Sequence, residues 1–261
     1  MRVLIPEIKH WGHCLGYASD MAATFADAGH EVVLAVSAAA YETPHSEVLN
    51  ELPAGVTIKK ISENAINYRS TEQGEMEWKL VTQLTADIEP HWIFVPTADA
   101  MLEAMSAETP GVIDDLRSCK IDFVVHAVLA GKWPRGLSTA RSYLEGVKKL
   151  RLLGRKCRLY TVDPYPSIGP GRFPIRAAGA KIPKYIPFSK PIESKLSQRE
   201  ARGALNWPLD NKLVIALGDV APRKAGSELI RAIQERGWPQ NTIHVLAGQI
   251  SSQCKATLRT L

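Results

Sequence analysis

Short apolar runs alternate with segments of helical spacing from the N-terminus onward. Val3–Ile5 has the length of a buried strand, and the next such run is Val32–Val36. The apolar positions between these runs recur at helical spacing: Ala18, Met21, Ala22 and Phe25. Gly29 stands where a left-handed residue is expected to end this helix. A strand, a helix and a second strand in this order predict a parallel pair, because a parallel connection needs a crossover.

The same alternation continues well beyond this first unit. Four further strands are predicted, at Val56–Ile61, Trp92–Val95, Ile121–Val125 and Leu159–Val162. Helices are predicted at Ser138–Leu153 and around the apolar face formed by Val81, Leu84 and Ile88, with Pro90 marking the end of the latter. This order of elements predicts an α/β fold with a Rossmann-like, doubly wound parallel sheet.

A second, shorter α/β pattern follows a proline-rich segment. Lys184–Pro191 is predicted to be a linker or domain crossing. After it come strands at Leu213–Leu217 and Ile243–Leu246, with a helical stripe between them at Leu229, Ile230 and Ile233. We therefore place an N-terminal Rossmann-like domain at residues 1–188 and the start of a second one at 189–261. Two strands do not make a sheet covered on both faces, so the second domain is expected to be incomplete.

Composition narrows the class of protein. The chain has 261 residues, of which 45% are hydrophobic and 23% charged, as in globular proteins. No apolar run approaches the roughly 20 residues that span a bilayer, and no signal segment is recognisable, so a cytoplasmic location is expected. The four cysteines are far apart, which predicts reduced thiols. A net charge of +5 suits a protein that meets phosphates, anionic lipid or nucleic acid, and a solvated surface explains it equally well.

Basic residues gather late in the first domain. They surround Leu150, Leu152 and Leu153 and comprise Lys148, Lys149, Arg151, Arg155, Lys156 and Arg158. A basic amphipathic helix can lie on anionic lipid, so peripheral contact with the inner membrane face is one interpretation of this cluster. A solvated helix face is the alternative interpretation.

The second domain carries the most specific resemblance. Its opening, Leu213–Ala232, contains a strand, a glycine turn, Arg223-Lys224 and a helix, and it resembles the GT-B superfamily, in particular the retaining glycosyltransferase family four. Gly29-His30-Glu31-Val32 at the end of the first helix is similar to the opening of the same family. The resemblance spans about the first two thirds of such an enzyme, because the family's acidic motif and donor-binding helix would lie beyond Leu261.

The resemblance implies transfer of a sugar from a nucleotide-diphosphate sugar to an acceptor, with retention of anomeric configuration. Lys224 matches the family's phosphate-binding lysine, with Gly218 and Arg223 beside it. Fixed cations at a helix start would stabilise the charge that grows on the departing diphosphate. An ordinary solvated pair of cations near a helix start is the alternative interpretation.

The segment departs from the family pattern at two positions. Asp219 stands where these enzymes commonly carry arginine, and its anion would repel a diphosphate unless a neighbour such as Arg223 compensates. Ala225 replaces the usual glycine after the lysine, although Gly226 follows it. Both departures bear on whether the chain is catalytic.

His126 matches the position of a histidine that bonds the donor sugar in this family. It directly follows the predicted strand Ile121–Val125, and α/β sheets bind ligands beyond the carboxyl ends of their strands. The alternative is a histidine whose ring is satisfied by backbone groups. Gly12, His13 and Gly16 form a loop that is expected to approach the acceptor side of the cleft, although His13 also fits a plain loop residue.

The remaining expectations concern partners. No cofactor and no metal are expected, and the nucleotide-diphosphate sugar is the co-substrate. The acceptor would be a sugar, a lipid-linked molecule or another small molecule, and nucleic acid is not expected.

Two other functions compete with the transferase. One is a non-catalytic fragment or degenerate relative that keeps only acceptor or phosphate binding. The other is a nicotinamide or flavin oxidoreductase, which is disfavoured because Gly-x-Gly-x-x-Gly is absent and Val36-Ser37-Ala38 replaces a ribose-binding carboxylate.

Overall fold

The structure is a computed structural model of the whole chain. It describes residues 1–10, 13–43, 46–62, 70–105, 116, 118–126, 144–150, 157–162, 176, 183–186, 196–217, 230–232, 235, 240–247 and 254. The chain divides into two compact units, Met1–Ser189 and Lys190–Leu261.

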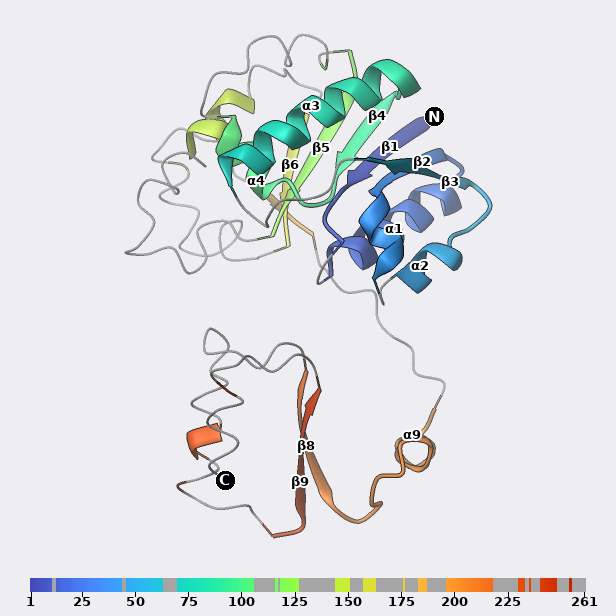
Figure 1. The fold of residues 1–261 in the computed structure, drawn as a ribbon, viewed down its shortest axis with the longest axis vertical. Coiled ribbons are helices and arrows are strands. Elements are labelled where there is room, and N and C mark those ends of the chain that lie inside the picture. Colours follow the sequence, from blue (N-terminus) through green and yellow to red (C-terminus); the bar gives the residue numbers. More distant parts are fainter. Residues whose placement is uncertain are drawn as a thin grey trace. The chain divides into compact units, whose positions relative to one another are not determined.

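The first unit is built on a seven-stranded parallel sheet (Figure 1). Its strands are β1 (Arg2–Glu7), β2 (Glu31–Ser37), β3 (Val56–Ile61), β4 (Trp92–Val95), β5 (Lys120–Val125), β6 (Cys157–Thr161) and β7 (Lys184–Tyr185). Their order across the sheet is β3-β2-β1-β4-β5-β6-β7. The predicted α/β class and doubly wound parallel sheet are confirmed, and the order reverses between β1 and β4.

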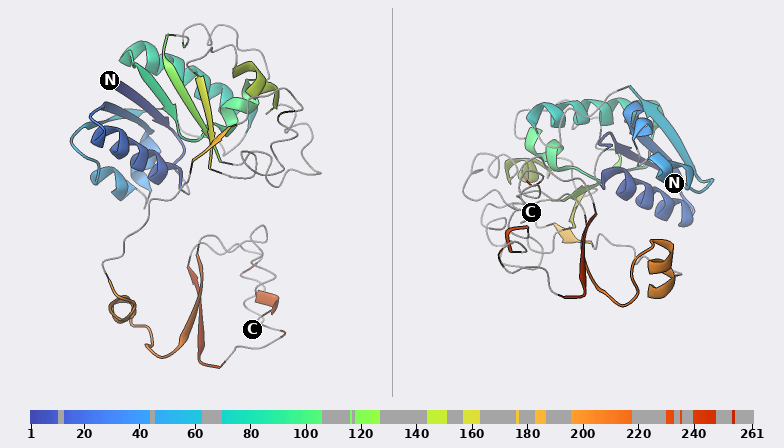
Figure 2. Two further views of the ribbon diagram at one scale, coloured as in Figure 1. Left: turned by 180° about the vertical axis from the view of Figure 1, so that it is seen from behind. Right: turned by 60° about the horizontal axis from the view of Figure 1, so that its bottom comes forward.

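Helices cover both faces of this sheet (Figure 2). On one face, α3 (Thr71–Ile88) and α4 (Asp99–Ala104) pack Trp78, Leu84 and Met101 against alternate strand residues. On the other face, α1 (Cys14–Asp27) and α2 (Glu47–Asn50) pack Leu15 and Leu49 against the intervening strand residues. Successive residues of each strand contact opposite helix layers, because side chains in a strand point to the two faces of the sheet in turn.

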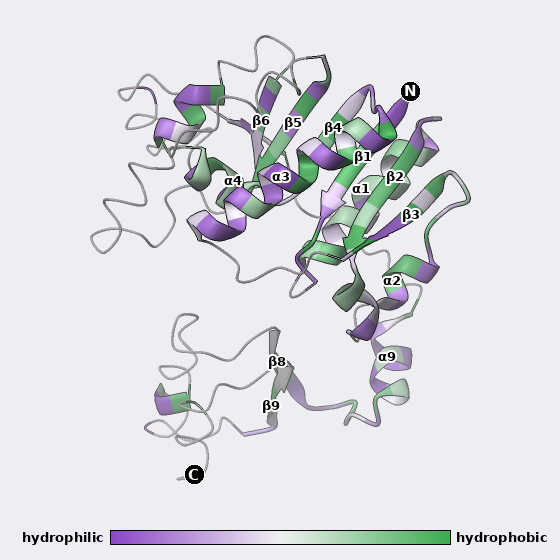
Figure 3. Cartoon of the chain, turned by 45° about the horizontal axis from the view of Figure 1, so that its top comes forward, coloured by the Kyte–Doolittle hydropathy of each residue, from purple (hydrophilic) through white to green (hydrophobic). Residues whose placement is uncertain are grey.

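Hydropathy agrees with this layering (Figure 3). β2 is mainly hydrophobic and buried from its second residue on, as expected for a strand covered on both faces. The edge strand β3 carries hydrophilic residues as well, and most of it is only half-buried or exposed. Burial on both faces therefore explains the continuous apolar runs in the inner strands.

The ends of the long helices have identifiable causes. Gly29 has φ of +80° just after α1, so the predicted left-handed glycine is confirmed. The hydroxyl of Ser70 accepts a hydrogen bond from the backbone N–H of Gln73 at the start of α3. α3 ends at Ile88 with Glu89 in the left-handed region, directly before Pro90. The 3-10 helix η1 (Ala38–Glu42), α2 and α4 were not predicted, because each is too short for a helical period to be recognised.

The end of the first unit differs from the prediction in two places. Lys184 and Tyr185, predicted to belong to a linker, form β7 and pair with Tyr160 and Thr161 of β6. The prediction was wrong there because two residues of edge strand leave no alternating pattern. β6 also begins at Cys157, two residues before the predicted strand.

The second unit contains α9 (Gln198–Ala204) and the parallel pair β8 (Lys212–Leu217) and β9 (Thr242–Ala247). Both predicted strands are confirmed. Ser197 and Glu200 form a reciprocal capping box at the start of α9.

All four cysteines are buried and free, in agreement with the predicted thiols. Within the described ranges, no helix combines the length and the apolar character that crossing a membrane requires.

Candidate functional site

The carboxyl ends of β1, β4 and β5 lie next to one another in the first unit. These strands end at Glu7, Val95 and Val125. The strand order reverses between β1 and β4, and doubly wound sheets bind ligands in the crevice at such a point. The residues that follow these three ends are therefore the natural candidates for a site.

Two histidines from different loops meet there. His13 precedes α1, His126 follows β5, and Nε2 of His13 lies 3.1 Å from Nδ1 of His126. Their rings stack with centroids 5.1 Å apart and planes inclined by 20°. The ring of Tyr17, one turn into α1, meets His126 edge-on with centroids 5.3 Å apart. His13 is exposed and His126 is half-buried.

A backbone carbonyl sets the tautomer of His126. Nε2 of His126 lies 2.8 Å from the carbonyl oxygen of Pro96, in the turn after β4. That oxygen only accepts, so Nε2 carries the hydrogen and Nδ1 of a neutral His126 is an acceptor. Nδ1 then accepts from Nε2–H of His13. The backbone N–H of His126 also donates to Oδ2 of Asp99, 3.0 Å away in the first turn of α4.

The surroundings keep His126 neutral. Burial lowers its pKa below the ordinary 6.5, and His13 and Lys9 lower it further. Asp99 and the bond to the Pro96 carbonyl act in the opposite direction without reversing the shift. At neutral pH the ring is therefore an uncharged acceptor.

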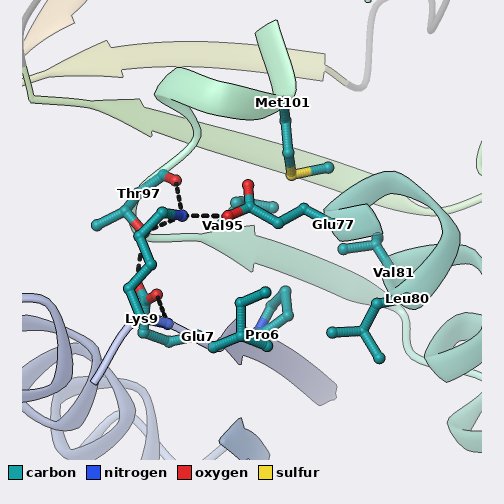
Figure 4. A pocket seen from close by; sticks show the side chains of 10 residues that line it. Pro6, Glu7, Lys9, Glu77, Leu80, Val81, Val95, Thr97 and Met101 are labelled. Atoms are coloured by element: carbon teal, nitrogen blue, oxygen red, sulfur yellow. Dashed lines mark hydrogen bonds and ion pairs between the residues drawn. The ribbon is translucent and has the colours of Figure 1, made fainter. Parts of the chain in front are cut away.

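A buried ionic network joins the segments after β1 and β4 to α3 (Figure 4). Nζ of Lys9 forms an ion pair with Glu77 of α3 and donates to the carbonyl oxygen of Thr97 at 3.0 Å and to its hydroxyl at 3.2 Å. The hydroxyl of Thr97 donates to Glu7, and Nε2 of Gln73 donates to Glu77 at 2.7 Å. The side chains of Lys9 and Glu77 are 3% and 7% exposed. Charges are buried at this depth only when they are paired and hydrogen-bonded, as they are here.

Burial and pairing pull the pKa values of the network apart. Burial raises the pKa of Glu7 to about 7, against the opposing effects of Lys9 and Thr97. Burial by itself would lower the pKa of Lys9, but the two carboxylates outweigh it and raise that pKa above its ordinary value. Lys9 is thus a permanent cation, and Glu7 keeps its proton to a higher pH than an ordinary glutamate does.

A small cavity lies beside the network. It is lined by Glu7, Lys9, Glu77 and Thr97 together with apolar side chains of α3 and α4. Its volume is about 10 Å³, room for about one water molecule. Oε2 of Glu77 is buried and has no hydrogen-bond partner within the described residues. The cavity is too small for a sugar or a nucleotide, so a substrate must bind outside it.

The structure places the predicted site residues unequally. His13 and His126 are brought together, and Gly16 lies in the first turn of α1, where a Cβ would meet nothing within 4 Å. Gly12 of the first loop, and Gly218, Arg223 and Lys224 of the second unit, lie outside the described residues, as do Asp219 and Ala225. Their predicted roles stay predictions.

Sequence reasoning missed most of the supporting residues. Glu7 and Lys9 carried a signal, because charged residues directly after a buried apolar run are unusual in a strand covered on both faces. Thr97 and Asp99 follow β4 in the same way. Glu77 carried none, because it reaches the site from the middle of α3.

The predicted basic helix needs a correction. Arg158 lies in β6 and makes two hydrogen bonds to Asp122 of β5, at 2.8 and 2.6 Å, so it is not part of a helix face. Lys148 forms an ion pair with Glu145 at 3.0 Å. Arg151, Arg155 and Lys156 lie outside the described residues. Contact with a membrane stays a prediction.

Among the described residues, no group of three or more histidine, cysteine, aspartate or glutamate side chains is arranged to hold a metal ion.

Comparison with solved structures identifies the fold. The catalytic domain of starch synthase IV from Arabidopsis thaliana, bound to ADP and acarbose, has a TM-score of 0.61 at 11% identity and matches 99% of this chain and 70% of its own. A trehalose-6-phosphate protein from E. coli, bound with UDP-2-fluoro glucose, has a TM-score of 0.59 at 10% identity over 100% of this chain and 69% of its own. The chain has a GT-B fold.

The same GT-B fold occurs in proteins of different activity. UDP-GlcNAc 2-epimerase from Neisseria meningitidis, bound to UDP-GlcNAc, has a TM-score of 0.54 at 11% identity and matches 100% of this chain and 68% of its own. The chain thus spans about two thirds of the length of these GT-B proteins. No protein-family model and no curated protein matches the sequence.

Proposed function

We propose that the chain belongs to a glycosyltransferase that moves a sugar from a nucleotide-diphosphate sugar to an acceptor, with retention of anomeric configuration. The observation that carries this proposal is the pair His13–His126 at the carboxyl edge of a GT-B sheet. Solved GT-B structures bound to ADP, UDP-2-fluoro glucose and UDP-GlcNAc support a nucleotide sugar as the ligand class.

His126 would bond a hydroxyl of the donor sugar. Its Nε2 is held by the Pro96 carbonyl, so Nδ1 is the atom that would accept from the hydroxyl, in place of His13. A neutral acceptor is suited to this bond, because it accepts from a hydroxyl without adding charge to the site. His13, at the exposed end of the pair, would contact the acceptor or the donor from the solvent side.

Arg223 and Lys224 of the second unit, with Gly218, would bind the diphosphate. Their cationic side chains would stabilise the charge released as the glycosidic bond breaks. The donor phosphate itself would take the acceptor's proton, so no covalent enzyme nucleophile and no metal are part of the proposed mechanism.

Nucleotide binding tests the diphosphate part of this proposal. Purified protein is titrated calorimetrically with UDP, ADP and thymidine diphosphate. Lys224→Ala should lower the affinity for the nucleotide that binds by about tenfold or more. This factor corresponds to the loss of one hydrogen bond to a charged group. Lys79→Ala, which changes an exposed lysine of α3, should leave the affinity unchanged. If no nucleoside diphosphate binds, or if both variants bind like the wild type, the diphosphate site is wrong.

The histidine pair is tested with nucleotide sugars. His126→Ala should bind the nucleotide sugar more weakly than the wild type does. Its affinity for the corresponding nucleoside diphosphate should be the same as that of the wild type. Release of nucleoside diphosphate in the presence of candidate acceptors then separates an enzyme from a binding protein. Binding without any release would favour the alternative of a non-catalytic relative.

A further inference from the structure

The turn that carries the Pro96 carbonyl is held from two sides. The backbone N–H of Ala98 donates to the carbonyl oxygen of Val124 in β5, at 2.8 Å. On the other side, Nζ of Lys9 donates to the carbonyl oxygen of Thr97 at 3.0 Å. Both bonds hold the Thr97–Ala98 peptide unit, which directly follows the peptide unit that presents the Pro96 oxygen to His126, and so they restrict the orientation of that preceding unit.

Lys9 is well suited to this task. It lies two residues after β1, it is buried, and its charge is paired with Glu77 of α3. The ammonium group donates to Glu77 and to both oxygens of Thr97, so its donors are directed at named acceptors. Because it is sealed from solvent, it is not placed to touch a sugar or a phosphate.

We infer that Lys9 is a positioning residue: through Thr97 it holds the Pro96 carbonyl, which in turn fixes His126 as the Nε2–H tautomer, so that Nδ1 is an acceptor. The importance of this tautomer for sugar binding rests on the function proposed above. The tautomer itself is a property of the free protein, so it is measured without any substrate.

The decisive variant removes the ammonium group without leaving Glu77 as an unpaired buried carboxylate. Lys9→Met/Glu77→Gln replaces both members of the ion pair by neutral side chains of similar shape. Glu77→Gln alone is the matched control, because it keeps the bonds from Lys9 to Thr97. The tautomer of His126 is read from long-range ¹H–¹⁵N correlations of the imidazole at a pH where the ring is neutral.

The wild type and Glu77→Gln should show Nε2–H alone, whereas the double variant should show a mixture of both tautomers. Glu77→Gln also changes the local charge but keeps the bond to the Thr97 carbonyl, so a mixture confined to the double variant reports on position and not on charge. An unchanged Nε2–H tautomer in the folded double variant would overturn the inference.

Thr97→Val provides a second test in a side chain of similar size. It removes the hydroxyl but keeps the carbonyl that Lys9 binds, so His126 should remain Nε2–H. Mixed tautomers in this variant would show that the hydroxyl, and not the bond from Lys9 to the carbonyl, orients the turn. This test stands even if the double variant does not fold.

Turnover then connects the tautomer to function. A misplaced functional group can lower an enzymatic rate by up to about a hundredfold. The rate of nucleoside diphosphate release by Lys9→Met/Glu77→Gln should therefore decrease by up to that factor. In a His126→Ala background the same double change should have little further effect, because Lys9 acts through His126. Additive losses of turnover would contradict the inference. If neither the wild type nor any variant shows turnover but the tautomers are as expected, only the proposed transferase function is contradicted.

Discussion

Lys9 and Glu77 form an ion pair between two almost fully buried side chains, although 68 positions separate them in the sequence. Lys9 lies two residues after the interior strand β1, and Glu77 lies in α3 on one face of the sheet. The pair joins the switch point of the strand order to the helix layer above it.

Breaking this pair should strongly destabilise the protein. Lys9→Met leaves a carboxylate buried without its partner, which costs about 3–5 kcal/mol of unfolding free energy. Lys148→Met, which breaks a pair with side chains 38% and 45% exposed, should cost less than about 1 kcal/mol. Urea unfolding of both variants measures the difference, and equal losses would show that the buried pair is not special.

Glu7 should make stability depend on pH. Its pKa of about 7 in the folded protein is higher than the ordinary 4.5. The folded state therefore holds a proton that the unfolded state has lost, and the resulting stabilisation is complete below pH 4.5 and disappears as the pH rises through 7. The change amounts to about 3 kcal/mol.

Glu7→Gln should abolish that dependence. Urea unfolding of wild type and variant, measured side by side from pH 4.5 to pH 8, should show the wild type losing free energy relative to the variant as pH rises. Parallel curves for the two proteins would mean that Glu7 keeps an ordinary pKa in the fold.

His126 should act in the opposite direction. Burial lowers its pKa below 6.5, so the folded protein favours the neutral ring. Its contribution to stability is present above pH 6.5 and is lost as the pH falls through the lowered pKa. An NMR titration should find the His126 midpoint below pH 6.5.

Removing His13 should raise that midpoint, because His13 is one of the groups that lower the pKa of His126. His13→Ala is the test. Asp20→Asn, at an exposed position of α1, is the control and should leave the midpoint in place. A midpoint that does not respond to His13→Ala would show that the ring contact is not maintained in solution.

Gly74 should tolerate no larger residue. A Cβ at this position of α3 would lie 2.0 Å from the carbonyl oxygen of Ala100 in α4, so the helices could no longer pack as closely. Gly74→Ala should therefore cost about 1–3 kcal/mol or more. Gly203→Ala in α9, where a Cβ meets nothing within 4 Å, should instead stabilise that helix by about 0.5–1 kcal/mol. Thermal unfolding of both variants compares the two, and a Gly74→Ala variant as stable as the wild type would contradict the close packing.

Much of the fold could be predicted because it depends on local patterns. The apolar runs at Val32–Val36 and Trp92–Val95 correspond to β2 and β4, since strands buried on both faces need continuous apolar sequence. Gly29 could be assigned because few other residues adopt positive φ at low cost. The edge strand β7 could not be predicted, because two residues at a sheet edge carry no periodic signal.

The sequence by itself determined the α/β class, the parallel order of strand and helix, and the position of His126 after a strand, because each follows from periodicity over neighbouring residues. Only the tertiary structure decided that His126 meets His13, 113 positions away, and that a carbonyl of Pro96 selects its tautomer. It also decided that Lys9 is sealed against Glu77 and not exposed to a ligand. Contacts of this kind depend on which strand ends and helix faces become neighbours in the fold. Burial at these contacts then shifts the pKa values of the side chains. Neither effect can be predicted from a local sequence pattern.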